Sequence, residues 1–171
     1  MTSLDPVLRA LASAAGERVE VSTPSANAVH CHVSSQDVAG VVDVALRELG
    51  TELILMAADD RRRQSNAFFI HYLFARRADN WFLHLSVRLD GSQPELVSLA
   101  PSCYPASRFE REIRDLFGIA ISGHPDPTPL VKHGFWPSDY YPLRKDAPTA
   151  DFSQLGPPLG GCCGGGACHN H

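Results

Sequence analysis

Potential metal ligands gather near the end of the sequence. Five cysteine and histidine side chains fall within the last ten residues: Cys162, Cys163, Cys168, His169 and His171. Thiolates and imidazoles are preferred ligands of zinc, nickel and copper(I). Their spacing matches no standard zinc module, and the neighbouring glycines favour a flexible chain that would have to order on binding the metal. The segment is therefore a weak metal-site candidate, and a disordered tail is the alternative.

Other histidines and cysteines lie in segments with a different pattern. His30 and His32 flank Cys31, and strand alternation puts the two imidazoles on one face. Two histidines can bind a metal, but no third ligand is evident, so we interpret them as partly exposed strand residues. Cys103 is expected to be a small packed residue. His124 precedes a proline and is interpreted as a neutral histidine that bonds to the backbone of a turn.

Paired carboxylates offer a second kind of chemistry. Glu110 and Glu112 could act as a general acid and base, but no nucleophile, metal or phosphate-binding loop accompanies them. The segment is more typical of an amphipathic helix. Ser107 and Glu110 have the spacing of a capping box, and Gly118 is suited to the C-terminal end. At 100° per residue, one stripe of the helix is apolar. It consists of Phe109, Ile113, Leu116 and Phe117.

The charged residues of this helix are spaced for ion pairs along its own surface. Glu110 with Arg114, and Arg111 with Asp115, are four residues apart. Such pairs contribute about 0.2–0.5 kcal/mol each to an isolated helix. The pattern predicts that Arg111, Arg114 and Asp115 point away from the apolar stripe.

The elements before this helix predict an α+β domain. Helical spacing occurs at residues 4–15 and again at 35–49, where Gly50 follows the last apolar position. Strand-like segments include residues 51–57, 68–74, 81–87 and 95–99, and the short connections among them favour antiparallel pairing. The expected fold is a mostly antiparallel sheet with helices on one face.

The chain changes character after Gly118. Prolines recur through residues 119–150, which predicts extended coil, and the same stretch keeps Phe135, Trp136, Tyr140 and Tyr141. A long irregular segment that retains large aromatic residues usually packs against another surface. The sequence thus predicts an α+β domain at residues 1–118, an irregular, proline-rich partner-binding arm at 119–150, and a flexible tail at 151–171. We call residues 119–150 the arm.

Composition excludes several classes of partner. Of 171 residues, 44% are hydrophobic and 20% charged, and the net charge is −4, so the clustered basic surface of a nucleic-acid-binding protein is not expected. The one basic cluster, residues 61–63, follows two aspartates and is interpreted as a solvated turn. No apolar run reaches the ~20 residues of a membrane-spanning helix, and the N-terminus lacks the pattern of a secretory signal. The uneven cysteines are typical of a reducing compartment rather than a disulfide framework.

Three sequence blocks carry a family resemblance. They are residues 109–119 (FEREIRDLFGI), 123–126 (GHPD) and 142–146 (PLRKD). In this order and spacing they resemble the signature of the complex I thirty-kilodalton subunit family, which includes the C subunit of bacterial NADH–quinone oxidoreductase. The resemblance covers roughly residues 30–148 and is strongest between 109 and 146.

The resemblance implies a subunit with no active site and no cofactor of its own. Such a subunit docks against a partner related to the large subunit of nickel–iron hydrogenases and against iron–sulfur subunits. Contact with the membrane is then indirect, at its cytoplasmic side. Eleven residues of the matched blocks and the arm are expected to bind partners: Glu110, Arg111, Glu112, Asp115, His124, Trp136, Tyr140, Tyr141, Arg144, Lys145 and Asp146.

The branch of the family is indicated by the stretch before the last block. Trp136-Pro137, ahead of PLRKD, resembles the energy-converting membrane-bound nickel–iron hydrogenases, including the formate hydrogenlyase type. That branch implies iron–sulfur clusters and a nickel–iron centre in the parent complex. The alternative is the C subunit of an NADH–quinone oxidoreductase, which implies FMN, NAD and quinone there. An alternative of another class is a metal-binding protein that uses the cysteine and histidine tail.

Overall fold

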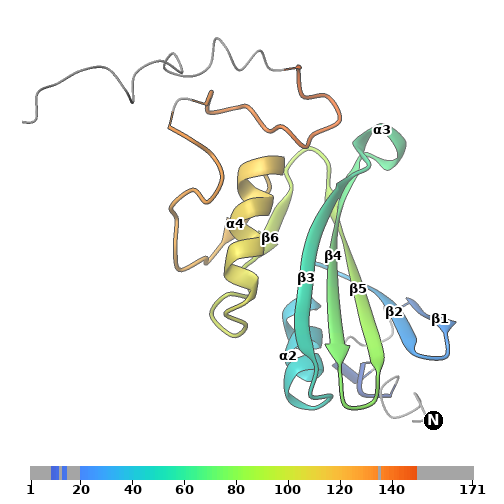
Figure 1. Ribbon diagram of the computed structural model, residues 1–171. Coiled ribbons are helices and arrows are strands. Elements are labelled where there is room, and N and C mark those ends of the chain that lie inside the picture. Colours follow the sequence, from blue (N-terminus) through green and yellow to red (C-terminus); the bar gives the residue numbers. More distant parts are fainter. Residues whose placement is uncertain (1–8, 12, 15–19, 135, 150–171) are drawn as a thin grey trace, which may run out of the picture.

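The computed structural model describes residues 9–11, 13–14, 20–134 and 136–149, and the metal-site candidates of the tail lie outside these ranges. The main sheet has five strands in the order β1-β2-β5-β4-β3 (Figure 1). Its strands are β1 (Glu20–Ser25), β2 (Ala28–Val33), β3 (Glu52–Asp60), β4 (Ala67–Arg76) and β5 (Trp81–Asp90). A second, two-stranded sheet pairs β6 (Glu95–Val97) with β7 (Ala120–Ser122).

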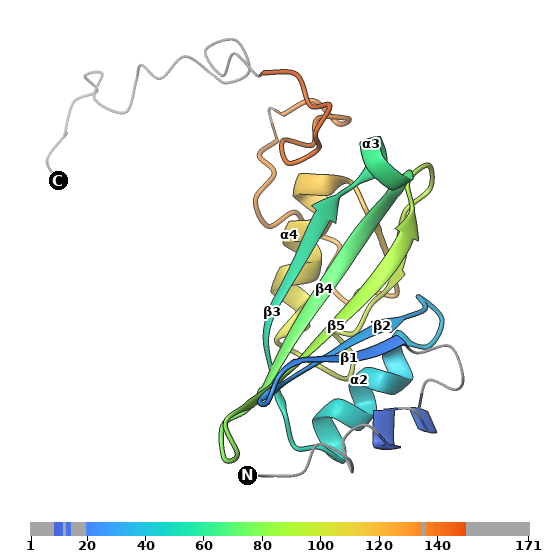
Figure 2. The same ribbon diagram turned by 90° about the vertical axis from the view of Figure 1, so that its right-hand side faces the viewer.

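Three helices accompany the strands, in addition to helical residues 9–11 and 13–14. They are α2 (Val38–Arg47), α3 (Arg62–Ser65) and α4 (Ala106–Phe117). Helices α2 and α4 lie on the same side of the main sheet (Figure 2). Pairing is antiparallel for β1 with β2, β3 with β4 and β4 with β5, and parallel only for β2 with β5 within this sheet. The predicted α+β class, with a mostly antiparallel sheet, is therefore confirmed.

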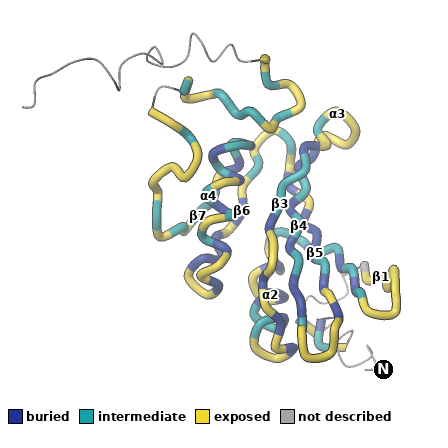
Figure 3. Tube along the Cα trace, viewed as in Figure 1, coloured by how far each residue is buried: buried dark blue, intermediate teal, exposed yellow. Residues whose placement is uncertain are grey.

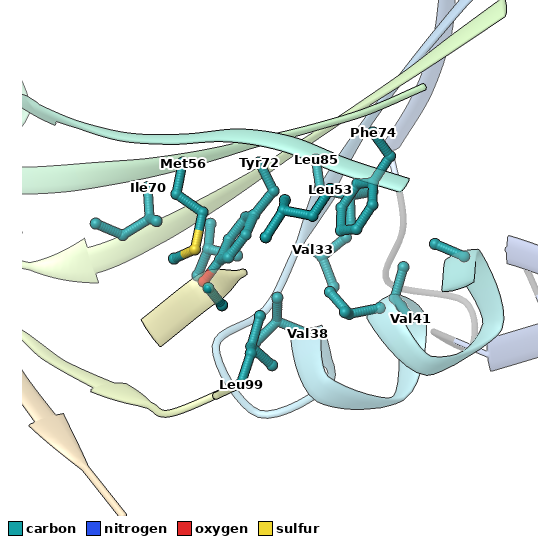
Figure 4. Packing of buried hydrophobic residues seen from close by; sticks show 14 of the residues in the cluster. Val33, Val38, Val41, Leu53, Met56, Ile70, Tyr72, Phe74, Leu85 and Leu99 are labelled. Carbon is teal, nitrogen blue, oxygen red and sulfur yellow. The ribbon is translucent and has the colours of Figure 1, made fainter. Parts of the chain in front are cut away.

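The core lies between the main sheet and the helices α2 and α4. Alternate side chains of β4 point inward, and Phe68, Ile70, Tyr72 and Phe74 have no exposed surface. Phe68 meets Phe117 of α4 edge to face, with ring centres 6.5 Å apart. Ile70, Tyr72 and Phe74 belong to one buried cluster with Leu85 of β5 and with Val38 and Val41 of the apolar stripe of α2 (Figure 4). This stripe includes Val38, Val41, Val42 and Ala45, all expected from the helical spacing.

Helix α4 begins differently from the sequence expectation. Its N-cap is Pro105, which makes no side-chain cap, and the first turn is set by the N–H of Ala106 donating to the carbonyl of Cys103 at 2.9 Å. Ser107 already lies inside the helix, and Glu110 bonds elsewhere. The capping-box prediction is wrong, because both side chains find tertiary partners that a pattern of local spacing cannot reveal. The predicted end is correct, since Gly118 adopts φ 67° as a left-handed C-cap.

The arm begins with β7 and then contains no helix or strand in its described residues. It passes across the end of α4 toward α3 (Figure 1). Most of its residues are exposed or only partly buried, whereas the main sheet and α4 hold the buried positions (Figure 3). An irregular chain with so little buried surface must be held by specific polar contacts, because it lacks a core of its own.

Candidate partner-binding site

The carboxylate of Asp115 is the first contact that holds the arm. Its side chain is only 4% exposed, and Oδ2 accepts hydrogen bonds from the backbone N–H groups of Leu130, Val131 and Lys132 at 2.6, 2.8 and 3.2 Å. Three successive N–H groups converging on one anion form a concave anion-binding site of the kind called a nest. Burial by itself would raise the pKa of Asp115, but these hydrogen bonds outweigh burial and hold the pKa below its ordinary value.

Two arginines of α4 hold the segment just before this nest. Arg111 donates from Nε and a terminal nitrogen to the carbonyls of Thr128 and Pro129, at 3.0 and 3.1 Å. Its other terminal nitrogen pairs with Asp126 at 2.8 Å. Arg114 donates to the same Thr128 carbonyl at 2.6 Å. A guanidinium can do this because its five N–H donors lie in a rigid plane.

These contacts replace the ion pairs expected along the helix. Arg111 pairs with Asp126 rather than Asp115, and Arg114 contacts its neighbour Asp115 at 3.4 Å rather than Glu110. Asp115 is directed to the arm rather than to a neighbour on its own helix, and its side chain is buried there. The arm supplies backbone donors and acceptors that satisfy these charges better than an exposed neighbour on the same helix.

Glu110 turns to the other side of α4 and has no exposed surface. Its two carboxylate oxygens accept hydrogen bonds from the hydroxyl of Ser98 and the backbone N–H of Leu99, both at 2.6 Å. Burial raises the pKa of this carboxyl, although the hydrogen bonds oppose the rise. Glu110 is thus enclosed by the chain itself, where it ties α4 to the segment after β6.

His124 fastens the beginning of the arm to the first turn of α4. Its Nδ1 accepts the backbone N–H of Asp126 at 2.9 Å, so the ring proton is on Nε2, which donates to the carbonyl of Ser107 at 3.1 Å. The side chain is 3% exposed. The predicted bonding of this histidine to the backbone of a turn is thereby confirmed.

The last sequence block returns to the C-terminal end of α4. Arg144 donates to the carbonyl of Phe117 at 2.6 Å and to that of Gly118 at 3.2 Å, and its guanidinium lies 4.4 Å from the ring centre of Tyr141. The final carbonyls of a helix carry partial negative charge and have no partner within the helix, so a cation suits this position.

A charge network then joins the arm to α3. Arg62 lies between Asp60 and Asp146, with nitrogen–oxygen distances of 2.7 and 2.5 Å. Asp60, whose side chain is 1% exposed, also accepts the backbone N–H of Lys145 at 2.9 Å. The hydrogen bond from Arg62 is the main reason that the pKa of Asp60 is well below its usual range. Sequence reasoning interpreted this basic cluster as a solvated turn, and for Arg62 that is wrong.

The aromatic side chains lie on the outer part of the arm. Trp136, Tyr140 and Tyr141 are partly buried, and the rings of Trp136 and Tyr140 meet edge to face at 5.7 Å. Tyr140 and Tyr141 also line a hollow that includes Pro137 and Asp139. Glu112 is exposed beside a mainly apolar groove. The groove is lined by Leu55, Met56, Ala57, Ala58, Phe109, Glu112, Ile113, Phe117 and Leu143.

Three aliphatic residues of the arm face outward. Leu130, Val131 and Leu143 are 42%, 36% and 48% exposed. Val131 contributes a backbone N–H to the nest, and Leu143 donates its own to the Leu116 carbonyl at 3.1 Å. The backbone is thus held from within while the apolar side chains are presented outward.

The contacts of the site attach the arm to α4 and to α3. Most of the charged groups expected at the site are engaged with backbone groups or with other side chains, whereas Glu112 is exposed and Lys145 takes part through its backbone N–H and carbonyl. Among residues 9–11, 13–14, 20–134 and 136–149, no three or more His, Cys, Asp or Glu side chains form a group that could hold a metal ion. In the same residues, no helix has the length and apolar character to cross a membrane.

Known proteins share both the sequence and the fold. Residues 31–153 match the family model described as respiratory-chain NADH dehydrogenase, 30 Kd subunit. Formate hydrogenlyase subunit 5 of Escherichia coli is 31% identical over 120 residues, which cover 65% of this chain and 21% of that protein. The C subunit of NADH-quinone oxidoreductase from Roseobacter denitrificans is 32% identical over 129 residues, covering 72% of this chain and 62% of that protein.

The chain thus spans less than two thirds of each of these relatives. The fold is also that of a chain in the structure of the membrane-bound sulfane sulfur reductase, an archaeal respiratory membrane complex. The TM-score is 0.69 at 13% identity, over 86% of this chain and 87% of that one. The matched residues include all of α4 and all of the arm that it holds. The chain therefore belongs to the family of the 30 kDa subunit of respiratory-chain NADH dehydrogenase.

Proposed function

We propose that this chain is a docking subunit, without an active site or cofactor of its own, in the peripheral arm of a complex-I-like membrane-bound oxidoreductase. Its partners are a subunit related to the large subunit of nickel–iron hydrogenases and iron–sulfur subunits, on the cytoplasmic side of the membrane. The parent complex is an energy-converting hydrogenase, and the likeness to formate hydrogenlyase subunit 5 favours this branch.

One observation carries the proposal: α4 fixes the arm through polar groups, and the arm presents apolar side chains to the outside together with partly buried aromatic rings. Exposed Leu130 and Leu143 lie on the same irregular segment as the Trp136–Tyr140 pair. Interfaces draw most of their binding energy from a few well-buried side chains, among which tryptophan, tyrosine and arginine predominate. Fixing the backbone in advance reduces the entropy lost when a partner binds.

A separate observation supports the second branch, the C subunit of an NADH–quinone oxidoreductase. The C subunit of NADH-quinone oxidoreductase from Roseobacter denitrificans matches a larger share of this chain than the formate hydrogenlyase protein does, 72% against 65%. The alternative proposal is a C subunit that docks in the same manner in an NADH–quinone oxidoreductase. The two branches differ in the cofactors of the purified complex, since only the first contains nickel and only the second contains FMN reducible by NADH.

The test is to tag the full chain in its native host and purify the intact complex. We expect Trp136→Ala to reduce co-purification of the large-subunit homologue by at least about tenfold, the effect of ~1.4 kcal/mol, while the thermal midpoint of the free chain changes little. The matched control is Tyr104→Ala, an aromatic residue that is 83% exposed and lies outside the arm. Equal recovery of the complex with both variants would argue against docking through the arm. Metal and flavin analysis of the wild-type complex then decides the branch.

A further inference from the structure

Four histidines lie on the face of the main sheet opposite α2 and α4. His30 and His32 come from β2, His71 from β4 and His84 from β5. Their inward-pointing neighbours, such as Cys31 and Leu85, are fully buried, so strand alternation directs the imidazoles outward. Figure 2 shows that none of the drawn helices covers this face. None of the four histidines belongs to the blocks that carry the family signature.

The sheet register brings two of these rings together. His71 is paired with Ser86 and His84 with Leu73, so the histidines are diagonal neighbours on adjacent antiparallel strands. Nδ1 of His71 lies 3.0 Å from Nε2 of His84. Both residues are partly buried and so remain open to solvent from one side.

His30 supports the second ring of this pair. It lies directly across from His84 on the parallel strand, and the two rings stack at 4.4 Å with an interplanar angle of 11°. Its Nε2 is 3.0 Å from the hydroxyl of Ser86, which is also 3.1 Å from Nδ1 of His32. Stacking on one side and the β-ladder beneath restrict the orientation of His84, which limits the entropy lost on binding a ligand.

We propose that His71 and His84 form a two-imidazole binding site for a divalent transition-metal ion, Ni²⁺ or Cu²⁺. At metal–nitrogen distances of roughly 2.0–2.1 Å, a nitrogen–nitrogen separation of 3.0 Å subtends an angle of about 94° at the metal. That is close to the right angle between neighbouring ligands in square-planar Cu²⁺ and Ni²⁺ sites and smaller than the tetrahedral angle favoured by Zn²⁺. Water completes the coordination, because only these two protein ligands take part.

The protonation states fit this chemistry. Metal binding needs neutral imidazoles with free lone pairs. Burial lowers the pKa of His84 to about 4 and also lowers that of His71, with the neighbouring histidines adding to both effects. Other charges near His71 are Asp59 and Arg61, which act in opposite directions. When the ion enters, the ring proton between the two histidines moves to the outer nitrogen of its own ring, and no redox step is involved.

The test uses the full-length chain with the tail ligands replaced, so that they cannot compete. The background variant carries Cys162→Ser, Cys163→Ser, Cys168→Ser, His169→Ala and His171→Ala. Calorimetric titration with NiCl₂ at pH 7.5 should show one ion bound per chain. We expect His71→Ala or His84→Ala to abolish this signal and His133→Ala, which changes a histidine of the arm, to leave it unchanged.

A second measurement keeps the proposal testable if a histidine variant fails to fold. Cu²⁺ added in substoichiometric amounts to the background variant should give an electron paramagnetic resonance spectrum with hyperfine coupling to two imidazole nitrogens. A spectrum without nitrogen coupling, or Ni²⁺ binding that survives both His71→Ala and His84→Ala, would leave only a hydrogen-bonded histidine pair and overturn the site. The outcome is independent of whether the arm docks to a partner.

Discussion

At the scale of single residues, the signature charges bind backbone groups as well as other side chains. Asp115 gathers three N–H groups, and Arg144 caps two carbonyls at the end of α4. Backbone groups of an irregular segment have no ladder or helix to satisfy them, and leaving them buried without partners costs free energy. Charged side chains at fixed positions of a helix meet this need, which explains why these residue types belong in the signature.

We predict that Asp115→Asn lowers the free energy of unfolding by about 2–4 kcal/mol at pH 7, since hydrogen bonds to a charged acceptor are worth ~1.5–3 kcal/mol each and an amide satisfies fewer donors. Urea unfolding followed by circular dichroism measures this change in the free energy of unfolding. The matched control is Asp43→Asn on α2, whose carboxylate is 49% exposed and pairs with Arg47, with an expected change under about 0.5 kcal/mol.

The carboxylate of Asp115 also determines how the stability of the fold changes with pH. The pKa of Asp115 is lower in the folded chain than in the unfolded one. Its contribution to the free energy of unfolding is therefore complete above the unfolded pKa of about 4, and it is lost as the pH falls through the folded pKa. The stability difference between wild type and Asp115→Asn should therefore shrink when the pH is lowered from 7 toward 3. A constant difference over this range would mean that the charge of Asp115 is not what holds the nest.

At the scale of elements, the end of α4 depends on one glycine. Gly118 has φ 67°, and a Cβ placed there would lie 2.6 Å from both the Arg144 side chain and the Tyr141 ring. Gly50 after α2 has φ 62° but no atom within 4 Å of such a Cβ. The two positions therefore share the backbone strain and differ in the space available.

We predict that Gly118→Ala is clearly more destabilising than Gly50→Ala. Alanine in the left-handed region costs about 1–2 kcal/mol at either position. At Gly118 the added methyl group must also displace Tyr141 and Arg144, which adds roughly 1–3 kcal/mol. Thermal unfolding of both variants measures the difference. Equal midpoints would show that the arm moves away from the helix end at little cost.

The sequence predicted the elements better than their contacts. Alternation of apolar residues placed β4 and β5 and their inward faces, and the spacing at residues 35–49 placed α2, because each pattern reports burial against one core. The irregular arm was also expected, from its prolines. The parallel pairing of β2 with β5 is set by long-range packing, which no local pattern encodes.

The site was predicted in part. The matched blocks included the charged residues of α4 and the arm, among them Asp126, the partner of Arg111. The partners outside these blocks were not predicted. Asp60, Arg62 and Ser98 were missed as members of the site, although each makes a direct contact to a signature residue or to the backbone beside it. The two aspartates before three arginines were a usable signal for the first two. Ser98 carries no local signal, because its partner lies 12 positions away and is chosen by the fold.

At the scale of the whole molecule, the arm is attached along its length. Asp115 and Arg111 hold its middle, Arg144 holds the segment near its end, and Asp146 joins it to α3 through Arg62. A segment ordered before binding loses less conformational entropy on association than one that folds on its partner. The contacts within the chain are therefore expected to govern assembly although they do not touch a partner.

We predict that Arg111→Lys weakens assembly while leaving the domain folded. A lysine ammonium can pair with Asp126, but it cannot also reach the carbonyls of Thr128 and Pro129 in the plane that the guanidinium occupies. Hydrogen exchange should show faster exchange at residues 126–132 than in wild type, with the strands of the main sheet unchanged. Co-purification of the large-subunit homologue should fall in parallel, and further for Arg111→Ala.

The control for this prediction is Arg47→Lys on α2, since Arg47 is 72% exposed and makes only a surface ion pair with Asp43. It should change neither exchange in the arm nor recovery of the complex. Normal assembly of Arg111→Lys despite faster exchange would mean that the partner orders the arm by itself. Slow exchange together with weak assembly would instead place Arg111 at the interface. The two measurements together therefore separate a role within the chain from direct contact, which assembly alone cannot do.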